Sequence, residues 1–423
     1  MMGSKRKGAP ARRIASWGSA GEELVSEQVP RSRRGRSSAL GLPRTLLEAS
    51  NSRSNNLDFI RVVMASLVIL THAFDVFIET KLPEPLTFLT RGQLTSGAFA
   101  VGVFFLVSGY LVTASWRNSK SVFDFFRKRV LRVHPGFIVS CAICLLVVGP
   151  IAASDVGAYY SEISPLRFIT DALLLEVVDM PPAFEAPYSV NGTLWMIQIE
   201  FLCYVLLGII GGARLLNQGI VTLGIVVAWA LMALPLFPAV FSRLPAQGTI
   251  AFLNSHFRFA TFFFIGALGY LMRDRIPYRP SWAFGALAVF ALGAATGTGY
   301  LLFPPAMAYL VAFVGFYPGL PIADFAKKRD LSYGIYLYGW PVQFILAAYL
   351  GRQMNPYLFS LISLLLACLA ALGSWTFVEG PALRLKRRIS PSAHQPAPDQ
   401  VIESAPPVSW TEEEKLPAAA DRR

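Results

Sequence analysis

The residues best suited to chemistry interrupt one apolar segment, residues 57–77. Arg61 and His72 are eleven positions apart, which in a helix is three turns plus roughly 20°, so both project from one face about 16 Å apart along the axis. Asp58 falls within roughly 60° of that face. Titratable groups in a membrane span are costly and usually line an interior site, and histidine exchanges protons readily near neutral pH. The segment therefore predicts a proton-transfer site, with Asp58 and Arg61 as binding groups. The alternative is a histidine that only bonds a neighbouring carbonyl.

A second candidate is the pair of Arg129 and Arg132, which lie three positions apart and share a helix face. Planar guanidinium groups match the oxygens of phosphate bidentately, so the pair predicts a clamp for a ligand with several phosphates. Ordinary basic flanking of a membrane helix explains the two residues equally well.

A third candidate is Glu200, in the apolar stretch 191–204. A carboxylate within a membrane helix is either paired or functional. By residue rise, Glu200 lies roughly 14 Å and His72 roughly 8 Å below the outer membrane surface, so an interior contact between them is feasible. Trp195 contacts a substrate or belongs to the aromatic belt, and Tyr333 lines a cavity or sits at helix contacts.

The elements that must position these residues are membrane helices. The chain is 54% hydrophobic and only 15% charged, against about 25% charged for soluble domains. We predict an all-α, polytopic membrane protein with about ten transmembrane helices. The predicted spans are 57–77, 98–115, 137–153, 192–210, 219–237, 258–272, 282–302, 305–320, 331–350 and 357–378.

The net charge of +12 raises nucleic acid as a partner, but its distribution favours a membrane instead. Basic residues gather before residue 57 and in 117–134, 273–279, 327–329 and 384–388, which all lie on one side if there are ten spans. The segment 154–190 is acidic and falls on the other side. The positive-inside rule then predicts a membrane protein with both termini cytoplasmic, and no nucleic-acid partner.

Three regions follow from this pattern: a basic disordered tail over 1–55, a transmembrane domain over 56–383 and a second disordered tail over 384–423. The four cysteines all fall in predicted spans. Cys141 and Cys144 have the spacing of a redox or metal pair, but no second pair accompanies them, so we expect small buried hydrophobic residues and no metal site.

Taken in order, these motifs resemble those of acyltransferase family 3, bacterial integral membrane enzymes that O-acylate cell-surface sugars. The resemblance extends over about 56–381. It rests on Leu57-Asp58-x-x-Arg61, an arginine followed after ten residues by His72, Phe-Phe-x-x-Ser-Gly at 104–109, Arg129-x-x-Arg132, Leu-Trp…Glu…Tyr at 194–204, Ser-Tyr-x-x-Tyr-Leu at 332–337 and Glu379-x-Pro381. Where relatives often have a Trp-His pair before the proline of the ninth span, this chain has Gly339-Trp340, so that histidine cannot be carried over.

The resemblance implies acyl-CoA, most often acetyl-CoA, as a donor substrate on the cytoplasmic side, with no permanently bound cofactor. The acceptor would be a sugar hydroxyl of an exopolysaccharide, lipopolysaccharide or lipid-linked oligosaccharide at the lipid bilayer. On this basis Arg129 and Arg132, with Arg61, would hold the donor phosphates. His72 would act as general base or carry the acyl group, and Glu200 would stabilise its imidazolium.

A proton-coupled membrane transporter is the alternative, since it would also place His, Glu and Arg inside a helix bundle. Clear repeat symmetry and interrupted helices would favour that alternative, and the sequence displays neither convincingly.

Overall fold

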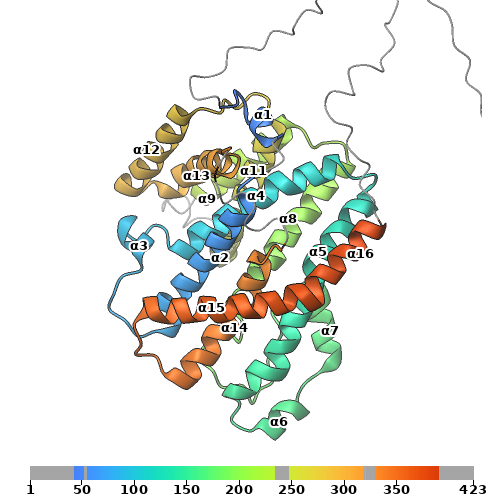
Figure 1. The fold of residues 1–423 in the computed structure, drawn as a ribbon, viewed down its shortest axis with the longest axis vertical. Helices are drawn as coiled ribbons and strands as arrows, with labels where there is room; N and C mark the ends of the chain where they lie inside the picture. The colour runs from blue at the N-terminus through green and yellow to red at the C-terminus, as the bar shows by residue number, and fades with distance from the viewer. Residues whose placement is uncertain (1–41, 52–54, 234–246, 319, 321–328, 390–423) are drawn as a thin grey trace, which may run out of the picture. The chain divides into compact units, whose positions relative to one another are not determined.

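The structure is a computed structural model that describes residues 42–51, 55–233, 247–318, 320 and 329–389. Within these residues the fold is all-helical, and its β-type pairings are two isolated bridges. The longer helices are α2 (Leu57–His72), α4 (Ser96–Arg117), α5 (Val122–Ile143), α7 (Pro165–Leu174), α8 (Trp195–Gly212), α9 (Gln218–Ala233), α11 (Gln247–Leu271), α12 (Pro280–Thr296), α13 (Gly299–Gly315), α14 (Ser332–Leu350), α15 (Pro356–Ser374) and α16 (Gly380–Ile389) (Figure 1). The shorter ones are α1 (Leu46–Ser50), α3 (Pro85–Leu89), α6 (Val156–Ser161), the π-helical η1 (Ala73–Phe77), η2 (Cys144–Val148) and η5 (Trp375–Glu379), and the 3-10 turn η3 (Gly149–Ala152).

The all-α prediction is confirmed for the described residues. The predicted ten transmembrane helices compare with five candidate membrane spans in the structure. Five helical stretches in the described residues are long and apolar enough to cross a bilayer: Leu57–Phe77, Ser96–Arg117, Val122–Ala152, Trp195–Gly212 and Pro356–Leu385. Four apolar helices are shorter: Gln218–Ala230, Arg258–Leu271, Pro280–Thr296 and Gly299–Gly315. Together with α14, these helices overlap all ten predicted spans.

One predicted boundary is wrong. The prediction ended the seventh span at residue 302, before Pro304 and Pro305, whereas the structure ends α12 at Thr296 and includes both prolines in α13. Gly297 has a φ of +77°, the left-handed conformation that closes helices and that glycine adopts without a steric penalty. The glycine, not the prolines, therefore separates the two helices.

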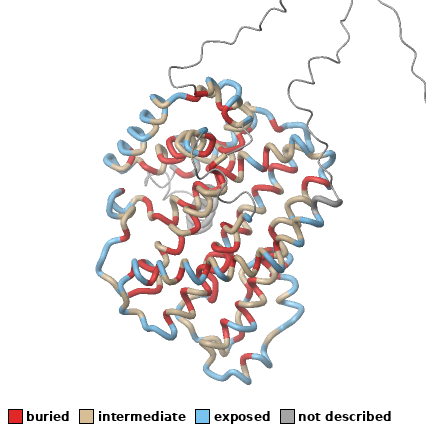
Figure 2. Tube along the Cα trace, viewed as in Figure 1, coloured by how far each residue is buried: buried red, intermediate tan, exposed pale blue. Residues whose placement is uncertain are grey.

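The centre of the bundle is built on α2, which packs against α4, α14 and α15. The Gly97 amide donates to Thr71 Oγ1 over 2.6 Å, and the Gln343 side-chain amide donates to the Ile69 carbonyl over 2.9 Å. These bonds fix the level of α4 and α14 beside the last turn of α2. Figure 2 shows that buried positions concentrate along these central helices, while much of α12 and α7 is exposed.

The arginine-rich segment 117–134 is mostly helical, since α5 begins at Val122 and includes the rest of the segment. Ser121 caps this helix by accepting from the Asp124 amide, and Asp124 forms an ion pair with Lys128 over 2.6 Å. Arg129 and Arg132 are thus held on a regular helix, as their spacing predicted.

The acidic segment 154–190 contains the helices α6 and α7, and its following residues are anchored to α14. Asn191 donates through its side chain to the Leu337 carbonyl over 3.0 Å. A Cβ atom on Gly192 would lie 2.6 Å from the Trp340 ring, so glycine allows the chain to pass close to α14.

Most of the tails predicted over 1–55 and 384–423 lies outside the described residues. Within the first, α1 spans Leu46–Ser50 and Leu46 is buried. Within the second, α16 continues to Ile389.

Candidate active site

A cavity of about 140 Å³ lies between α2, α4, α5, α8 and α14. It combines charged and aromatic groups with an apolar wall. Its polar lining comprises Arg61, Ser108, Arg129, Arg132, Glu200, Tyr204, Ser332, Tyr333 and Tyr336. Five residues nominated from sequence, namely the three arginines, Glu200 and Tyr333, therefore meet in one cavity although they come from four helices.

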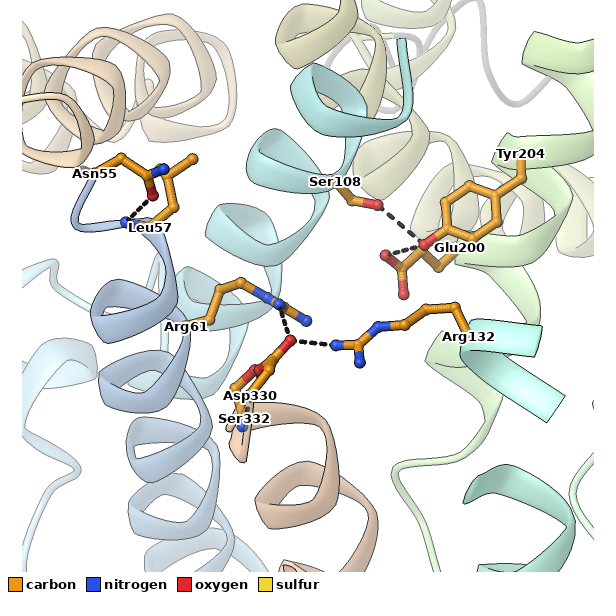
Figure 3. Close-up of polar contacts among 9 residues, drawn as sticks. All are labelled: Asn55, Leu57, Arg61, Ser108, Arg132, Glu200, Tyr204, Asp330 and Ser332. Carbon is orange, nitrogen blue, oxygen red and sulfur yellow. Dashed lines mark hydrogen bonds and ion pairs between the residues drawn. The ribbon is translucent and has the colours of Figure 1, made fainter. Parts of the chain in front are cut away.

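Asp330 organises two of the arginines, as Figure 3 shows. Its Oδ2 atom forms ion pairs with both Arg61, at 2.5 Å, and Arg132. Its Oδ1 atom accepts from the Ser332 hydroxyl over 2.6 Å. Burial by itself would raise the pKa of Asp330, but the two guanidinium groups outweigh it and hold the pKa below its ordinary value. The carboxylate therefore stays charged and fixes both guanidinium groups.

The opposite wall carries a hydrogen-bonded chain of two hydroxyl groups and one carboxylate. Tyr204 donates to Glu200 Oε1 over 2.7 Å, and its hydroxyl oxygen lies 3.1 Å from the Ser108 hydroxyl (Figure 3). Glu200 and Tyr204 are four residues apart on α8, so one helix face positions both. This chain gives the cavity a proton acceptor next to its cationic groups.

Arg129 lies beside this chain and retains an unused donor. Its Nη2 atom donates to the Ser115 hydroxyl over 3.1 Å, and its guanidinium lies over the Tyr204 ring at 5.9 Å from the centroid. Its Nε atom is buried and has no hydrogen-bond partner among the described residues. Because an unpaired buried donor costs free energy, this atom is suited to a ligand that accepts from it.

Tyr333 lines the cavity beside Arg132. Its hydroxyl donates to the Val133 carbonyl over 2.8 Å, and Arg132 lies over its ring at 5.7 Å. Glu379 is buried in η5, where it accepts from Ser374 over 2.9 Å. Glu379 and Arg132 also interact electrostatically.

His72 does not line this cavity. The cavity extends along α4 only as far as Val101, about 6 Å by helical rise from Gly97, which bonds Thr71. On α14 it ends at Tyr336, one turn before Trp340, whose ring lies 4.7 Å from the His72 ring. His72 is therefore about one helical turn beyond the end of the cavity.

No hydrogen bond or ion pair joins His72 to Glu200 in the part of the chain that the structure describes. The interior contact that their depths allowed is thus not formed, and Glu200 instead accepts from Tyr204. His72 Nδ1 is buried and has no hydrogen-bond partner among these residues.

Two aromatic residues of the lining, Phe104 and Tyr336, contact each other with 5.9 Å between ring centroids. Tyr336 also donates to the Thr193 carbonyl over 2.9 Å, which fixes its ring beside the cavity.

The two remaining nominated residues lie outside the lining. Asp58 is close enough to Asp330, Arg61 and Arg132 to interact electrostatically with them. Trp195 is 39% exposed and packs edge-on to Phe259 at 6.2 Å.

Sequence reasoning missed Asp330, Tyr204 and Tyr336 as site residues. Tyr204 follows Glu200 by four positions, and Tyr336 follows Tyr333 by three, so helical spacing could have found both. Asp330 carried one signal: it is a lone acidic residue between the basic run 327–329 and Ser332.

Comparisons with known proteins show the family of the chain. A family model described as an acyltransferase domain matches residues 54–379. The chain is 26% identical to an O-acetyl transferase of Shigella phage Sf6, over 77% of this chain and 95% of that protein. It is also 26% identical to nodulation protein 10 of Rhizobium leguminosarum bv. viciae, over 80% of this chain and 96% of that protein. No solved structure matches the chain. Because the family model covers most of its length, the chain belongs to acyltransferase family 3 and is a membrane O-acyltransferase.

Proposed function

We propose that the protein transfers an acyl group, most simply acetyl, from acyl-CoA to a sugar hydroxyl of a cell-surface glycan. The observation that carries this proposal is the cavity in which three arginines meet a carboxylate and several aromatic side chains. A coenzyme A donor carries several phosphates and a long uncharged arm, and the cavity offers cationic groups together with an apolar wall. Membership of an O-acyltransferase family favours this function over a proton-coupled transporter.

Arg61, Arg129 and Arg132 are the groups that would hold the donor's phosphates. Arginine has five N–H donors in a fixed fork, so the arginines bound to Asp330 keep further donors for a phosphate. Arg129 Nε is buried and has no hydrogen-bond partner in the described part of the chain. The carboxylates of Asp58, Asp330 and Glu200 offset much of the charge of these three arginines, so the guanidinium donors rather than a large net charge would bind the phosphates.

The distance along α2 suits the arm of the donor. Arg61 and His72 are about 16 Å apart by helical rise. A pantetheine arm has about as many chain bonds as four extended residues, or roughly 14 Å. A donor held by its phosphates at Arg61 would therefore bring its thioester near His72, provided that side chains at that end of the cavity move aside.

At that point His72 would act as general base. The imidazole would take the proton of the acceptor hydroxyl, whose oxygen forms the new C–O bond with the acyl carbon. The C–S bond would then break, and the departing thiolate of coenzyme A would take the proton back. Among the described residues, His72 Nδ1 has no hydrogen-bond partner that would compete for this role.

Glu200 takes a different part in this proposal from the one expected. Its carboxylate is bonded to Tyr204, so it would balance the charge of the arginines and orient Tyr204 and Ser108 toward the donor. Asp58 would support Arg61 from the rim, and Tyr333 would present its ring to the donor beside Arg132. Trp195 would contact the acceptor on the side of the bundle to which 154–190 belongs.

We assign the protein to the bacterial inner membrane with both termini in the cytoplasm. The basic segments then face the cytosol, where acyl-CoA is made, and 154–190 faces the periplasm. His72 lies toward the periplasmic side, where a glycan or lipid-linked oligosaccharide would approach it.

A comparison of surface glycans tests this function. Polysaccharides from the wild-type strain, a deletion strain and the deletion strain carrying His72→Ala would be analysed for O-acyl esters by NMR and mass spectrometry. Loss of one ester in both mutant strains, and its return with the wild-type gene, is the expected result. Unchanged esters in all strains would exclude a surface glycan as the acceptor.

A further inference from the structure

A second cavity, of about 430 Å³, lies on the opposite side of α4 from the candidate active site. It is enclosed by α2, α4, α11 and α13 and by the beginning of α12, and its lining is almost entirely apolar. Arg275 is its one charged residue among the described side chains, and Tyr110, Trp282 and Tyr309 are its aromatic residues with polar atoms. Nothing in the proposed acyl transfer uses this cavity.

The cavity runs along α13 from Pro305 to Phe316, the residue that follows the helix. These eleven helical steps correspond to about 16 Å. This length is about half of a hydrocarbon core that is roughly 30 Å thick, so it corresponds to one leaflet. Protein interiors contain few voids larger than a water molecule, and an empty apolar cavity forfeits dispersion contacts. A hydrocarbon chain from the surrounding membrane is the occupant that fits both the length and the lining.

Two glycines on α11 show where this helix touches α4 and where it borders the apolar cavity. A Cβ atom on Gly266 would lie 2.1 Å from the Leu106 carbonyl oxygen, because α11 and α4 are in close contact there. One turn later, a Cβ atom on Gly269 would meet no atom within 4 Å. Gly269 lines the cavity, so a side chain at this position would enter it.

A polar recess adjoins the cavity at the end of α11. It is lined by Arg117, Asn217, Gln218 and Arg275 among others, and Arg275 lines both spaces. Arg117 donates to the Leu216 carbonyl over 3.0 Å, and Arg275 donates to Gln218 Oε1 over 3.2 Å. Asp274 lies 3.9 Å from Arg275 in an exposed ion pair, which is weak.

Both guanidinium groups keep further donors in this recess, and guanidinium binds phosphate oxygens well. One amphiphile would satisfy both spaces, with its anionic group in the recess and its apolar chain in the cavity. A polyprenyl carrier is longer than one leaflet, and inorganic phosphate would leave the cavity empty.

We propose that this is a binding site for an anionic phospholipid, with its phosphate at Arg117 and Arg275 and one acyl chain in the apolar cavity. Val107 belongs to the walls of both cavities, so the bound chain supports the stretch of α4 that carries Ser108. The lipid therefore stabilises the wall of the active site without contacting the substrates.

Native mass spectrometry of the purified full-length chain tests this site. The protein would be delipidated and titrated with phosphatidylglycerol, with phosphatidylcholine of the same chains, and with inorganic phosphate. We expect phosphatidylglycerol to bind at least tenfold more tightly than phosphatidylcholine and phosphate not to compete. Equal binding of the two lipids would overturn the role of the arginines, and competition by phosphate would indicate a site for the free anion.

Two variants test the location. Gly269→Leu should fill the cavity and weaken phosphatidylglycerol binding at least tenfold, and Arg117→Ala with Arg275→Ala should abolish the preference for it. Gly373→Leu is the matched control, because a Cβ atom there also meets nothing within 4 Å but lies on α15. Wild-type binding by Gly269→Leu would overturn the proposal.

A chemical readout in the wild-type protein does not depend on either variant folding. Phosphatidylglycerol with a diazirine at the end of one acyl chain should cross-link to peptides of α11 and α13. Cross-links confined to other helices would exclude the cavity.

Discussion

At the scale of single residues, the phosphate clamp depends on a carboxylate as much as on its arginines. Asp330 holds Arg61 and Arg132 through one oxygen atom, and its side chain is only 17% exposed. Removing one partner of a buried charge network leaves the other charges unpaired, which commonly costs 2–5 kcal/mol. A donor phosphate would supply the negative charge that such a variant lacks.

Asp330→Asn should therefore lower the thermal midpoint of unfolding, and acyl-CoA should raise that midpoint more in the variant than in the wild type. Thermal unfolding with and without acyl-CoA measures both effects. Asp179→Asn is the control, since its ion pair with Arg167 is exposed and contributes little. An equal or smaller rise with acyl-CoA in Asp330→Asn would mean that phosphates do not bind at this pair.

His72→Ala should abolish acyl transfer, by at least about 100-fold, while leaving acyl-CoA binding intact. The reason is position: the histidine lies beyond the end of the cavity that would hold the donor phosphates. Radiolabelled transfer and equilibrium binding of acyl-CoA separate the two effects. His134→Ala, at a histidine that bonds the Leu173 carbonyl instead, should keep transfer. Most of the wild-type rate in His72→Ala would exclude the histidine from the chemistry.

Sequence could nominate these side chains better than it could place them. Residue type and spacing marked five side chains as interior. The structure brings all five together in one cavity: Arg61, Arg129, Arg132, Glu200 and Tyr333. The partner of Arg61 could not be predicted, since Asp330 is 269 positions away along the chain. Such a contact is set by the packing of α2, α5 and α14, which local patterns do not encode.

At the scale of helices, long apolar runs predicted where helices occur but not their depth or ends. The depths of His72 and Glu200 were counted along helices taken as upright, whereas membrane helices tilt by about 20° on average. The predicted seventh span ended at residue 302, although α12 ends at Thr296 and a left-handed glycine follows it. This boundary could not be read from apolar runs, because chain reversal depends on backbone conformation and on neighbouring helices.

The contact of α4 with α11 is also a property of helices, and it depends on glycines, which have no side chain to keep the helices apart. A Cβ atom on Gly109 would lie 1.8 Å from the Phe263 carbonyl oxygen, so the backbones touch there. Gly109→Ala should destabilise the protein by about 1–3 kcal/mol, as overpacking does, and lower its melting temperature in detergent. Gly285→Ala, where a Cβ atom meets nothing within 4 Å, should not. A wild-type melting temperature for Gly109→Ala would contradict this close packing.

At the scale of the whole molecule, the mechanism requires the basic and acidic segments to face opposite sides of the membrane. In intact cells with an opened outer membrane, Ser161→Cys should react with an impermeant thiol reagent, whereas Asn118→Cys should react only after lysis. Both positions are exposed, and Cys141, Cys144 and Cys203 are buried. Cys368, which is half-buried, would be replaced by serine in both variants. Labelling in the reverse order would place the arginines away from cytosolic acyl-CoA.

The central claim is that acyl groups pass from acyl-CoA on one side of the membrane to a sugar on the other. The most direct measurement uses proteoliposomes of one orientation, with labelled acetyl-CoA supplied only on the side of the basic segments and the acceptor glycan only on the opposite side. We predict labelled ester on the glycan with wild-type protein and none with His72→Ala. Absence of label on the glycan with folded wild-type protein, or equal label when the donor is supplied on the other side, would contradict the account.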